Sequence, residues 1–162
     1  PNDKWHLDEV VIPIGGVNHW LWRAVDAHGD ALDILVQTRR NAKAAKRFLT
    51  KLIAQYGQPR VIITDKLRSY IKPIARQASG ADHRDHKGLN NRIECSHRPT
   101  RRREKIIGRF KSPSQAQLFL AAHDQINTIF KPRRYRLTAP SYRHARADAF
   151  SLWHGYAVEI AA

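Results

Sequence analysis

Bulky and β-branched residues dominate three runs in the first part of the chain. The runs are WHLDEVVIPI (5–14), HWLWRAVDAHGD (19–30) and LDILVQTR (32–39). Gly15 and Gly16 separate the first two runs, and Gly29 lies at the end of the second. Extended runs joined by short glycine-containing turns predict three antiparallel strands arranged as a meander.

The spacing of the apolar residues becomes helical after residue 40. Asn41 is a good N-cap residue, and Gly57 and Pro59 end the pattern. Between them the apolar positions are Ala45, Phe48, Leu49, Leu52, Ile53 and Tyr56. This spacing predicts one amphipathic helix. Its opposite face is basic and is interpreted as solvated, with Lys43, Lys46, Arg47 and Lys51.

The rest of the chain predicts one buried strand, a further short strand after the next helix, and several helices. RVIITD (60–65) has the short, nearly all-apolar composition of a strand buried on both faces. Helices are expected over 67–77, from about residue 89, and after SPSQ (112–115), where Ser112 and Gln115 form a capping box. The order predicts an α/β fold with a mixed central sheet and helices on both faces.

The charge of the chain indicates a polyanionic partner. The 162 residues include 29 Lys and Arg against 14 Asp and Glu, a formal net charge of +15. Such an excess is typical of nucleic-acid binding, because each phosphate contact releases bound counterions. A charged scaffold of the ribosomal kind is the alternative. The single cysteine, Cys95, excludes an internal disulfide framework, and no apolar run is long enough to span a bilayer.

Three acids are candidates for a metal site. Asp65 ends the buried strand, Asp8 lies within the first strand, and Glu94 lies in the basic stretch HKGLNNRIECSHRPTRRRE (86–104). Because a strand alternates faces, Asp8 and Glu9 are expected to point in opposite directions, so that only one faces a site. Each acid also has a structural interpretation: Asp65 as a turn cap, Asp8 as the partner of a cross-strand arginine, and Glu94 in a salt bridge.

Taken together, two aspartates from neighbouring strands and a glutamate from a helix form a set of oxygen ligands suited to Mg²⁺. A pair of such ions can activate a nucleophile and stabilise a leaving oxygen at a phosphodiester. Glu94, His97, Arg98 and Arg101 share one helical face, so cations would lie beside the acid to hold the phosphate. Pro99 is expected to kink this helix, and a solvated basic face is the alternative.

A zinc site is a weaker interpretation of the same region. His83, His86, Cys95 and His97 lack the tight paired spacing and the number of thiolates typical of structural zinc. The tryptophans on the predicted strands are interpreted as core residues rather than as platforms for base stacking. They are Trp5, Trp20 and Trp22.

Four segments together resemble a known family. WHLDE, ITDKLRSY, HRDHKGLNNRIECSHRPTRRRE and RFKSPSQAQLFL are similar, in this order, to the catalytic domain of bacterial insertion-sequence transposases of family six. These belong to the DDE transposase and integrase superfamily, and the resemblance runs from about residue 4 to residue 142. It departs at Cys95 and Ser96, where a pair such as Asn-Ser is expected, and at Pro13, which suggests an edge or a bulge in the first strand.

The resemblance implies an RNase H-like fold and a metal-dependent enzyme. Asp8, Asp65 and Glu94 would be the catalytic, metal-binding acids, with Mg²⁺ as cofactor, two ions being expected and Mn²⁺ as a substitute. The chemistry implied is cleavage at transposon ends and transfer of the 3′-hydroxyl into target DNA. Residues expected to contact nucleic acid are Lys66, Arg68, His97, Arg98, Arg101, Arg102 and Arg103. The alternatives are another RNase H-like nuclease or integrase, and a catalytically silent DNA-binding module.

The expected organisation follows from the same resemblance. Residues 1–130 would form the catalytic core, and residues 131–162 a basic, partly helical tail. The helix-turn-helix region of the family is absent from these residues, and because the chain starts at Pro1 and has no methionine, we expect it to be a fragment. The expected partner is double-stranded DNA, bound by a homodimer or larger assembly in the bacterial cytoplasm, associated with the nucleoid when acting. Neither a membrane nor a small-molecule substrate is expected.

Overall fold

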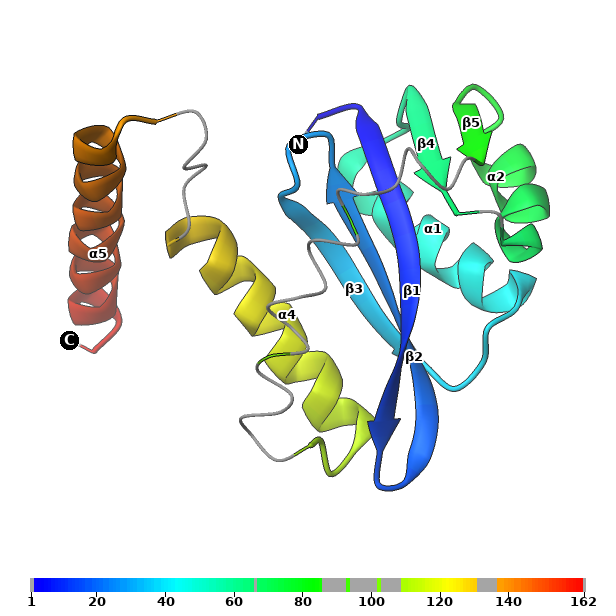
Figure 1. Cartoon of the computed structure of the whole chain (residues 1–162), viewed down its shortest axis with the longest axis horizontal. Helices are drawn as coiled ribbons and strands as arrows, with labels where there is room; N and C mark the ends of the chain where they lie inside the picture. The colour runs from blue at the N-terminus through cyan, green and yellow to red at the C-terminus, as the bar shows by residue number, and fades with distance from the viewer. Residues whose placement is uncertain are drawn as a thin grey trace. The chain divides into compact units, whose positions relative to one another are not determined.

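A five-stranded sheet forms the centre of the first part of the chain (Figure 1). The computed structural model describes residues 2–65, 67–85, 93, 102, 109–130 and 137–161. Strands β1 (Lys4–Ile14), β2 (Val17–Asp26) and β3 (Ala31–Gln37) pair antiparallel, which confirms the predicted meander. Strands β4 (Val61–Thr64) and β5 (Asp82–Asp85) join in parallel, in the order β3-β2-β1-β4-β5. The predicted mixed sheet is confirmed.

The alternation of side chains along β1 divides the core into two layers. Trp5 and Leu7 are buried on the face that packs against Phe48 and other residues of helix α1 (Ala42–Tyr56). Ile12 lies in the other hydrophobic cluster, with Phe110 and the start of helix α4 (Pro113–Phe130). Helices therefore cover both faces of the sheet, as the order of the elements predicts.

The predicted caps start both of these helices. In α1, the Asn41 Oδ1 accepts a hydrogen bond from the Ala44 backbone N–H at 3.0 Å. In α4, the Gln115 N–H donates to the Ser112 Oγ at 3.1 Å, while the Gln115 side chain accepts from the Lys111 N–H at 2.8 Å. The Gln115 side chain thus reaches one residue further back than in a standard capping box.

The helix predicted over 67–77 is divided in the structure. A 3₁₀ turn over Arg68–Tyr70 precedes the short helix α2 (Ile71–Gln77), which packs beside α1. Gln77 Nε2 donates to Thr50 Oγ1 at 2.5 Å, which joins the two helices. Of the helix expected from about residue 89, the structure describes only Ile93 and Arg102, and both are helical.

Pro13 lies in an uninterrupted β1, opposite Asn18 of β2. The expected bulge is wrong at this position, because the register shift of the sheet falls between Ala24 and Val25. The expected edge is correct in part: β4 pairs with β1 only as far as His6, and near Pro13 the described residues add only the single bridge between Ile14 and Phe110. A proline there removes no ladder hydrogen bond on that side.

The chain divides into two compact units, residues 1–121 and residues 122–162. In the second unit, helix α5 spans Ala139–Ala161, and the Phe130 ring lies 4.7 Å from the Phe150 ring and 5.9 Å from the Trp153 ring, between centroids. The domain limits expected from the sequence, 1–130 and 131–162, remain a prediction. Among the described residues, no helix combines the length and the apolar composition needed to cross a membrane.

Candidate metal site

Asp8 and Asp65 come together because β1 and β4 run parallel. The register places Trp5 beside Ile62 and His6 beside Ile63, so two positions further along Asp8 comes opposite Asp65. Asp65 directly follows the last residue of β4. One carboxylate oxygen each from Asp8, Glu9 and Asp65 lie within 4.8 Å of one another. The structure therefore brings together the two predicted strand acids and adds a third.

Glu9 changes the expected picture of this cluster. The alternation of the strand suggested that only one of Asp8 and Glu9 could face a site, yet both contribute an oxygen to the cluster. The ladder between β1 and β4 ends at His6, and in the described part of the chain no strand continues it beside Asp8 and Glu9. Side chains from both faces can therefore meet at the end of β4.

Two side chains hold the buried Glu9 carboxylate. Arg40 Nε donates to Glu9 Oε1 at 2.7 Å, and Arg40 Nη2 lies 2.6 Å from the same oxygen. The Tyr70 hydroxyl donates to the other oxygen, Oε2, at 2.9 Å. The Arg40 guanidinium in turn lies over the ring of Trp20, 4.8 Å from its centroid. Both oxygens of Glu9 are thus satisfied, as a buried carboxylate requires.

Asp65 has a separate role for each of its oxygens. Oδ1 accepts a hydrogen bond from the Leu67 N–H at 3.1 Å, which is the turn cap that its sequence position suggested. Oδ2 lies 3.7 Å from Arg40 Nη2. The Thr64 hydroxyl donates to the Asp65 backbone carbonyl at 2.8 Å and also lies 2.9 Å from His83 Nε2. The capping role therefore leaves Asp65 Oδ2 on the side of Arg40.

Burial and the closeness of the acids raise the pKa values of Glu9 and Asp65. Burial raises the pKa of Glu9 to about 7; the negative charge of Asp65 adds to this rise, and Arg40 opposes it. Burial also raises the pKa of Asp65, with a further contribution from the charge of Asp8. The pKa of the Tyr70 hydroxyl lies well above its usual range because the group is buried beside Glu9. A cation placed among these carboxylates would relieve their repulsion.

The donor atoms of this cluster suit a hard cation. Magnesium prefers carboxylate and water oxygens, and the three acids supply no nitrogen or sulfur. Among the described residues this is the only group of three acidic, histidine or cysteine side chains that converge. Of the four residues considered for zinc, only His83 lies in the described part of the chain, and its ring contacts Thr64.

Most of the other residues predicted for the site lie outside the described residues. These are Lys66, Glu94, His97, Arg98, Arg101 and Arg103. Arg68, at the start of the 3₁₀ turn that follows Asp65, is exposed, and so is Arg102. The structure thus places two of the three predicted catalytic acids together.

Sequence reasoning missed Glu9, Arg40 and Tyr70. Arg40 directly precedes the N-cap Asn41, and Tyr70 lies five residues after Asp65. The one available signal was that a glutamate buried within a hydrophobic strand requires a cationic partner. Which arginine would supply it depended on how the end of β3 turns back to start α1.

Comparisons with known proteins add to this geometry. The family model described as "DDE domain" matches residues 2–133. The transposase of the insertion-sequence-like element IS431mec from Staphylococcus aureus is 34% identical over 139 residues, covering 83% of this chain and 61% of the relative. The transposase of the insertion sequence element IS257 in transposon Tn4003 from Staphylococcus aureus matches to the same extent. The chain thus spans about three fifths of the length of these relatives.

Solved structures with low sequence identity share the fold. The catalytic core domain of BIV integrase matches with a TM-score of 0.58 at 17% identity, covering 82% of this chain and 86% of that one. The simian T-cell lymphotropic virus intasome, in complex with a PP2A regulatory subunit, matches with a TM-score of 0.62 at 17% identity, covering 86% of this chain and 51% of that one. These matches confirm the predicted RNase H-like fold.

Proposed function

This chain belongs to the DDE-domain family of insertion-sequence transposases, and from that premise we propose that it is a metal-dependent DNA transposase core. The reaction is hydrolysis of a phosphodiester at the transposon end, followed by attack of the freed 3′-hydroxyl on target DNA. The observation that carries this proposal is the convergence of Asp8, within β1, and Asp65, directly after the parallel strand β4, in a cluster of carboxylates.

Asp8 and Asp65 would hold the divalent metal, and Glu94 would complete the triad. Bound there, Mg²⁺ would supply charge neutralisation at the reacting phosphate and lower the pKa of the attacking water or hydroxyl. The HTLV-2 integrase catalytic core, which shares the fold with a TM-score of 0.57, was solved in complex with magnesium. The carboxylate-only donor set of this chain supports the same choice of metal.

Glu9 and Arg40 act in this proposal as positioning residues. Arg40 pairs with the buried Glu9 and also lies 3.7 Å from Asp65 Oδ2, so it ties the carboxylate of one strand to that of the next. The hydrogen bond from the Leu67 N–H fixes the other oxygen of Asp65. The Asp65 carboxylate would therefore be orientated before any metal or DNA binds, which reduces the reorganisation needed in the reaction.

The basic residues near the acids would bind the DNA backbone. The exposed Arg68 follows Asp65 closely in the chain, and the net charge of +15 favours a polyanion. The other proposed contacts are Lys66, His97, Arg98, Arg101, Arg102 and Arg103. A homodimer or larger assembly would hold two transposon ends together, and such an enzyme would act on nucleoid DNA in the bacterial cytoplasm.

The experiment that tests this function combines metal binding with strand joining. Mn²⁺ binding to the chain is measured by calorimetry for the wild type, Asp65→Asn and, as a matched control, Asp82→Asn. Asp82 is an exposed acid that pairs with Arg84. Asp65→Asn is expected to abolish binding, and Asp82→Asn to preserve it. Joining of a duplex with a free 3′-hydroxyl to a second duplex is then measured in the protein extended to the full length of its relatives.

Loss of joining in Asp65→Asn should exceed the roughly 10–100-fold effect of removing an outer partner of a metal ligand. Cutting without joining would instead identify a simple nuclease. Unchanged metal binding in Asp65→Asn would remove this residue from the site. If wild-type protein binds DNA but no metal, with or without DNA present, the chain is a silent DNA-binding module.

A further inference from the structure

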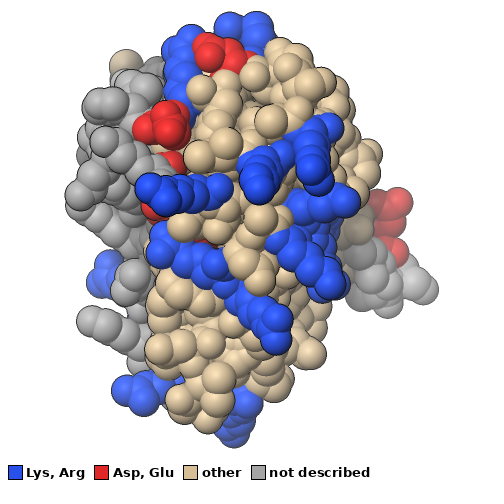
Figure 2. Space-filling view, turned by 90° about the vertical axis from the view of Figure 1, so that its right-hand side faces the viewer, with Lys and Arg blue, Asp and Glu red and all other residues tan. Residues whose placement is uncertain are grey.

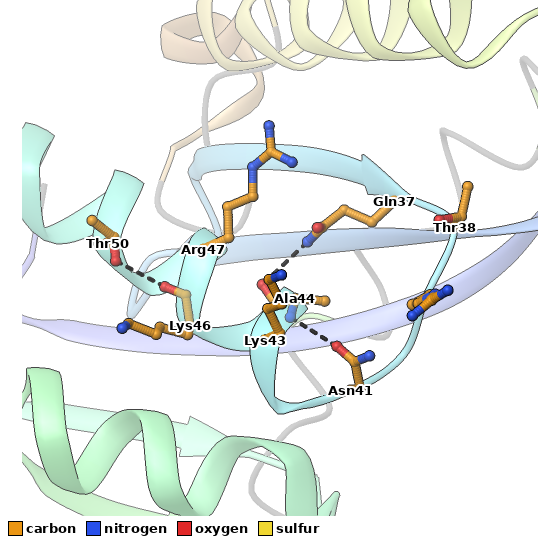
Figure 3. Close-up of a pocket in the computed structure, with 9 residues that line it drawn as sticks. Gln37, Thr38, Asn41, Lys43, Ala44, Lys46, Arg47 and Thr50 are labelled. Carbon is orange, nitrogen blue, oxygen red and sulfur yellow. Dashed lines mark hydrogen bonds between the residues drawn. The ribbon is translucent and has the colours of Figure 1, made fainter.

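Two adjoining grooves flank the first turns of α1. One has a volume of about 590 Å³ and lies between the end of β3 and α1; the other, of about 440 Å³, lies between α1 and α2. Lys43 and Lys46 line both grooves. Figure 3 shows the residues that line the first groove, among them Lys43, Lys46 and Arg47, with Asn41 capping the helix. The two grooves therefore form one surface that shares its central lysines.

Every charged side chain that lines the two grooves is positive. The six are Arg39, Lys43, Lys46, Arg47, Lys72 and Arg76. All six are exposed, and none forms an ion pair with an acid in the described part of the chain. Figure 2, which views the side of the molecule that carries α1 and α2, shows lysines and arginines gathered across this face. We name these six residues the α1–α2 basic surface.

Other cations on the same unit differ from this group. Lys51, Arg60 and Arg84 each pair with a neighbouring aspartate, at 2.6–2.8 Å. Lys51 lies on the same helix as Lys43 and Lys46, one turn or more further along, and its charge is neutralised by Asp33. The basic face of α1 is thus not uniformly solvated: its first half carries unpaired charge, and α2 brings two more cations to it.

We propose that the α1–α2 basic surface binds the phosphate backbone of duplex DNA, at a position separate from the reacting phosphodiester. Lys43, Lys46 and Arg47 are spaced i, i+3 and i+4, which places them together on one face of the helix. Duplex DNA carries a charge about every 1.7 Å along its axis, so a row of exposed cations can neutralise several phosphates without reading the sequence. The surface is built from flexible, exposed ammonium and guanidinium groups, which suit a backbone contact rather than base recognition.

The choice of DNA as the ligand rests on the proposed transposase function, and the α1–α2 basic surface lies close to the proposed metal site. Arg39 of the surface directly precedes Arg40, which contacts both Glu9 and Asp65. Lys72 lies seven residues after Asp65, on the helix that follows the site. The surface therefore starts beside the acids, and a duplex held there would be an additional segment of the transposon end or of the target.

The test measures binding of the chain to a labelled duplex of about 30 base pairs of arbitrary sequence, by fluorescence anisotropy, over a series of salt concentrations. The variant is Lys43→Gln, Lys46→Gln, Lys72→Gln. The matched control is Arg60→Gln, Arg84→Gln, Lys111→Gln. It also removes three positive charges, but from exposed positions outside the grooves. Lys43→Arg, Lys46→Arg, Lys72→Arg keeps the charge. Circular dichroism melts establish that each variant is folded.

The groove variant is expected to bind about tenfold or more weakly near 0.1 M salt, with a salt slope reduced by about two to three. The control should lose much less, and the arginine variant should bind as the wild type does. Equal losses in the groove variant and the control would overturn the proposal, because net charge alone would then explain binding. No loss in the groove variant would overturn it as well. Neither result bears on metal binding by Asp65, so a failure here is distinguishable from a failure of the proposed function.

Discussion

Arg40 and Glu9 form a two-nitrogen contact at the heart of the candidate site: Nε donates to Glu9 Oε1 at 2.7 Å, and Nη2 lies 2.6 Å from the same oxygen. The Glu9 side chain is fully buried, whereas that of Arg40 is 35% exposed. The arginine therefore brings a solvent-accessible charge to a carboxylate that has no contact with water. Removing the two partners should have unequal effects.

Arg40→Ala should destabilise the protein by about 2 to 3 kcal/mol, because it leaves a buried acid with only the Tyr70 hydrogen bond. Protonation of Glu9 would limit the loss, since its pKa is already about 7. Glu9→Gln combined with Arg40→Ala should recover much of the stability. Urea unfolding of the two single variants and the double variant gives the coupling energy. A double variant no more stable than Arg40→Ala would show that the arginine acts through other contacts.

Divalent metal should stabilise the fold. A ligand that binds only the folded state at about 100 times its Kd contributes about 2.7 kcal/mol, which corresponds to a rise in Tm of about 5–10 °C for a chain of this size. The rise is expected with Mn²⁺ for the wild type and for Asp82→Asn, and should be absent for Asp8→Asn and Asp65→Asn. Thermal melts with Mn²⁺ and with EDTA measure it. An equal rise in all four proteins would mean that the metal binds elsewhere.

His83 should make the protein less stable in mild acid. Burial lowers the pKa of its ring, so the unfolded chain takes up a proton at a higher pH than the folded protein does. Stability from this residue is therefore present above the ordinary histidine pKa of about 6.5 and is lost as the pH falls towards the folded value. His83→Gln should unfold with a smaller dependence on pH between about 7.5 and 5. Urea midpoints across this range test the sign, and an unchanged dependence would contradict it.

Phe48 should be among the residues most important for stability. Its side chain is fully buried in the layer between α1 and the sheet. Phe48→Ala is expected to cost about 3–5 kcal/mol, because it leaves a cavity between packed elements. Leu118, on α4, is 76% exposed, and Leu118→Ala should change the stability by less than about 0.5 kcal/mol. Denaturant unfolding compares the two directly.

Much of the fold could be predicted because it depends on local patterns. The alternation in 5–14 and the spacing after Asn41 reflect the periods of a strand and of a helix, and these hold wherever the segment lies. Asp8 and Asp65 could be found for a similar reason. An acid within or at the end of an apolar strand requires a partner whatever the topology.

The partners themselves could not be predicted in this way. Glu9 contacts Arg40 and Tyr70, which lie 31 and 61 residues further along the chain. These contacts depend on where β4 ends beside β1. No spacing in the sequence contains that information, since it arises from the pairing register and the packing of α1 and α2. For the same reason, the sequence predicted an ordinary solvated face on the basic side of α1. In the structure, α2 lies beside this face and adds Lys72 and Arg76 to it.

Local periodicity and composition thus specified the strands, the helix caps at Asn41 and Ser112, the positive charge and the two strand acids, because each depends on near neighbours alone. The tertiary structure decided which acids converge, which arginine neutralises Glu9 and which lysines remain unpaired. These follow from contacts between elements far apart in the chain, where register and burial determine which charges meet.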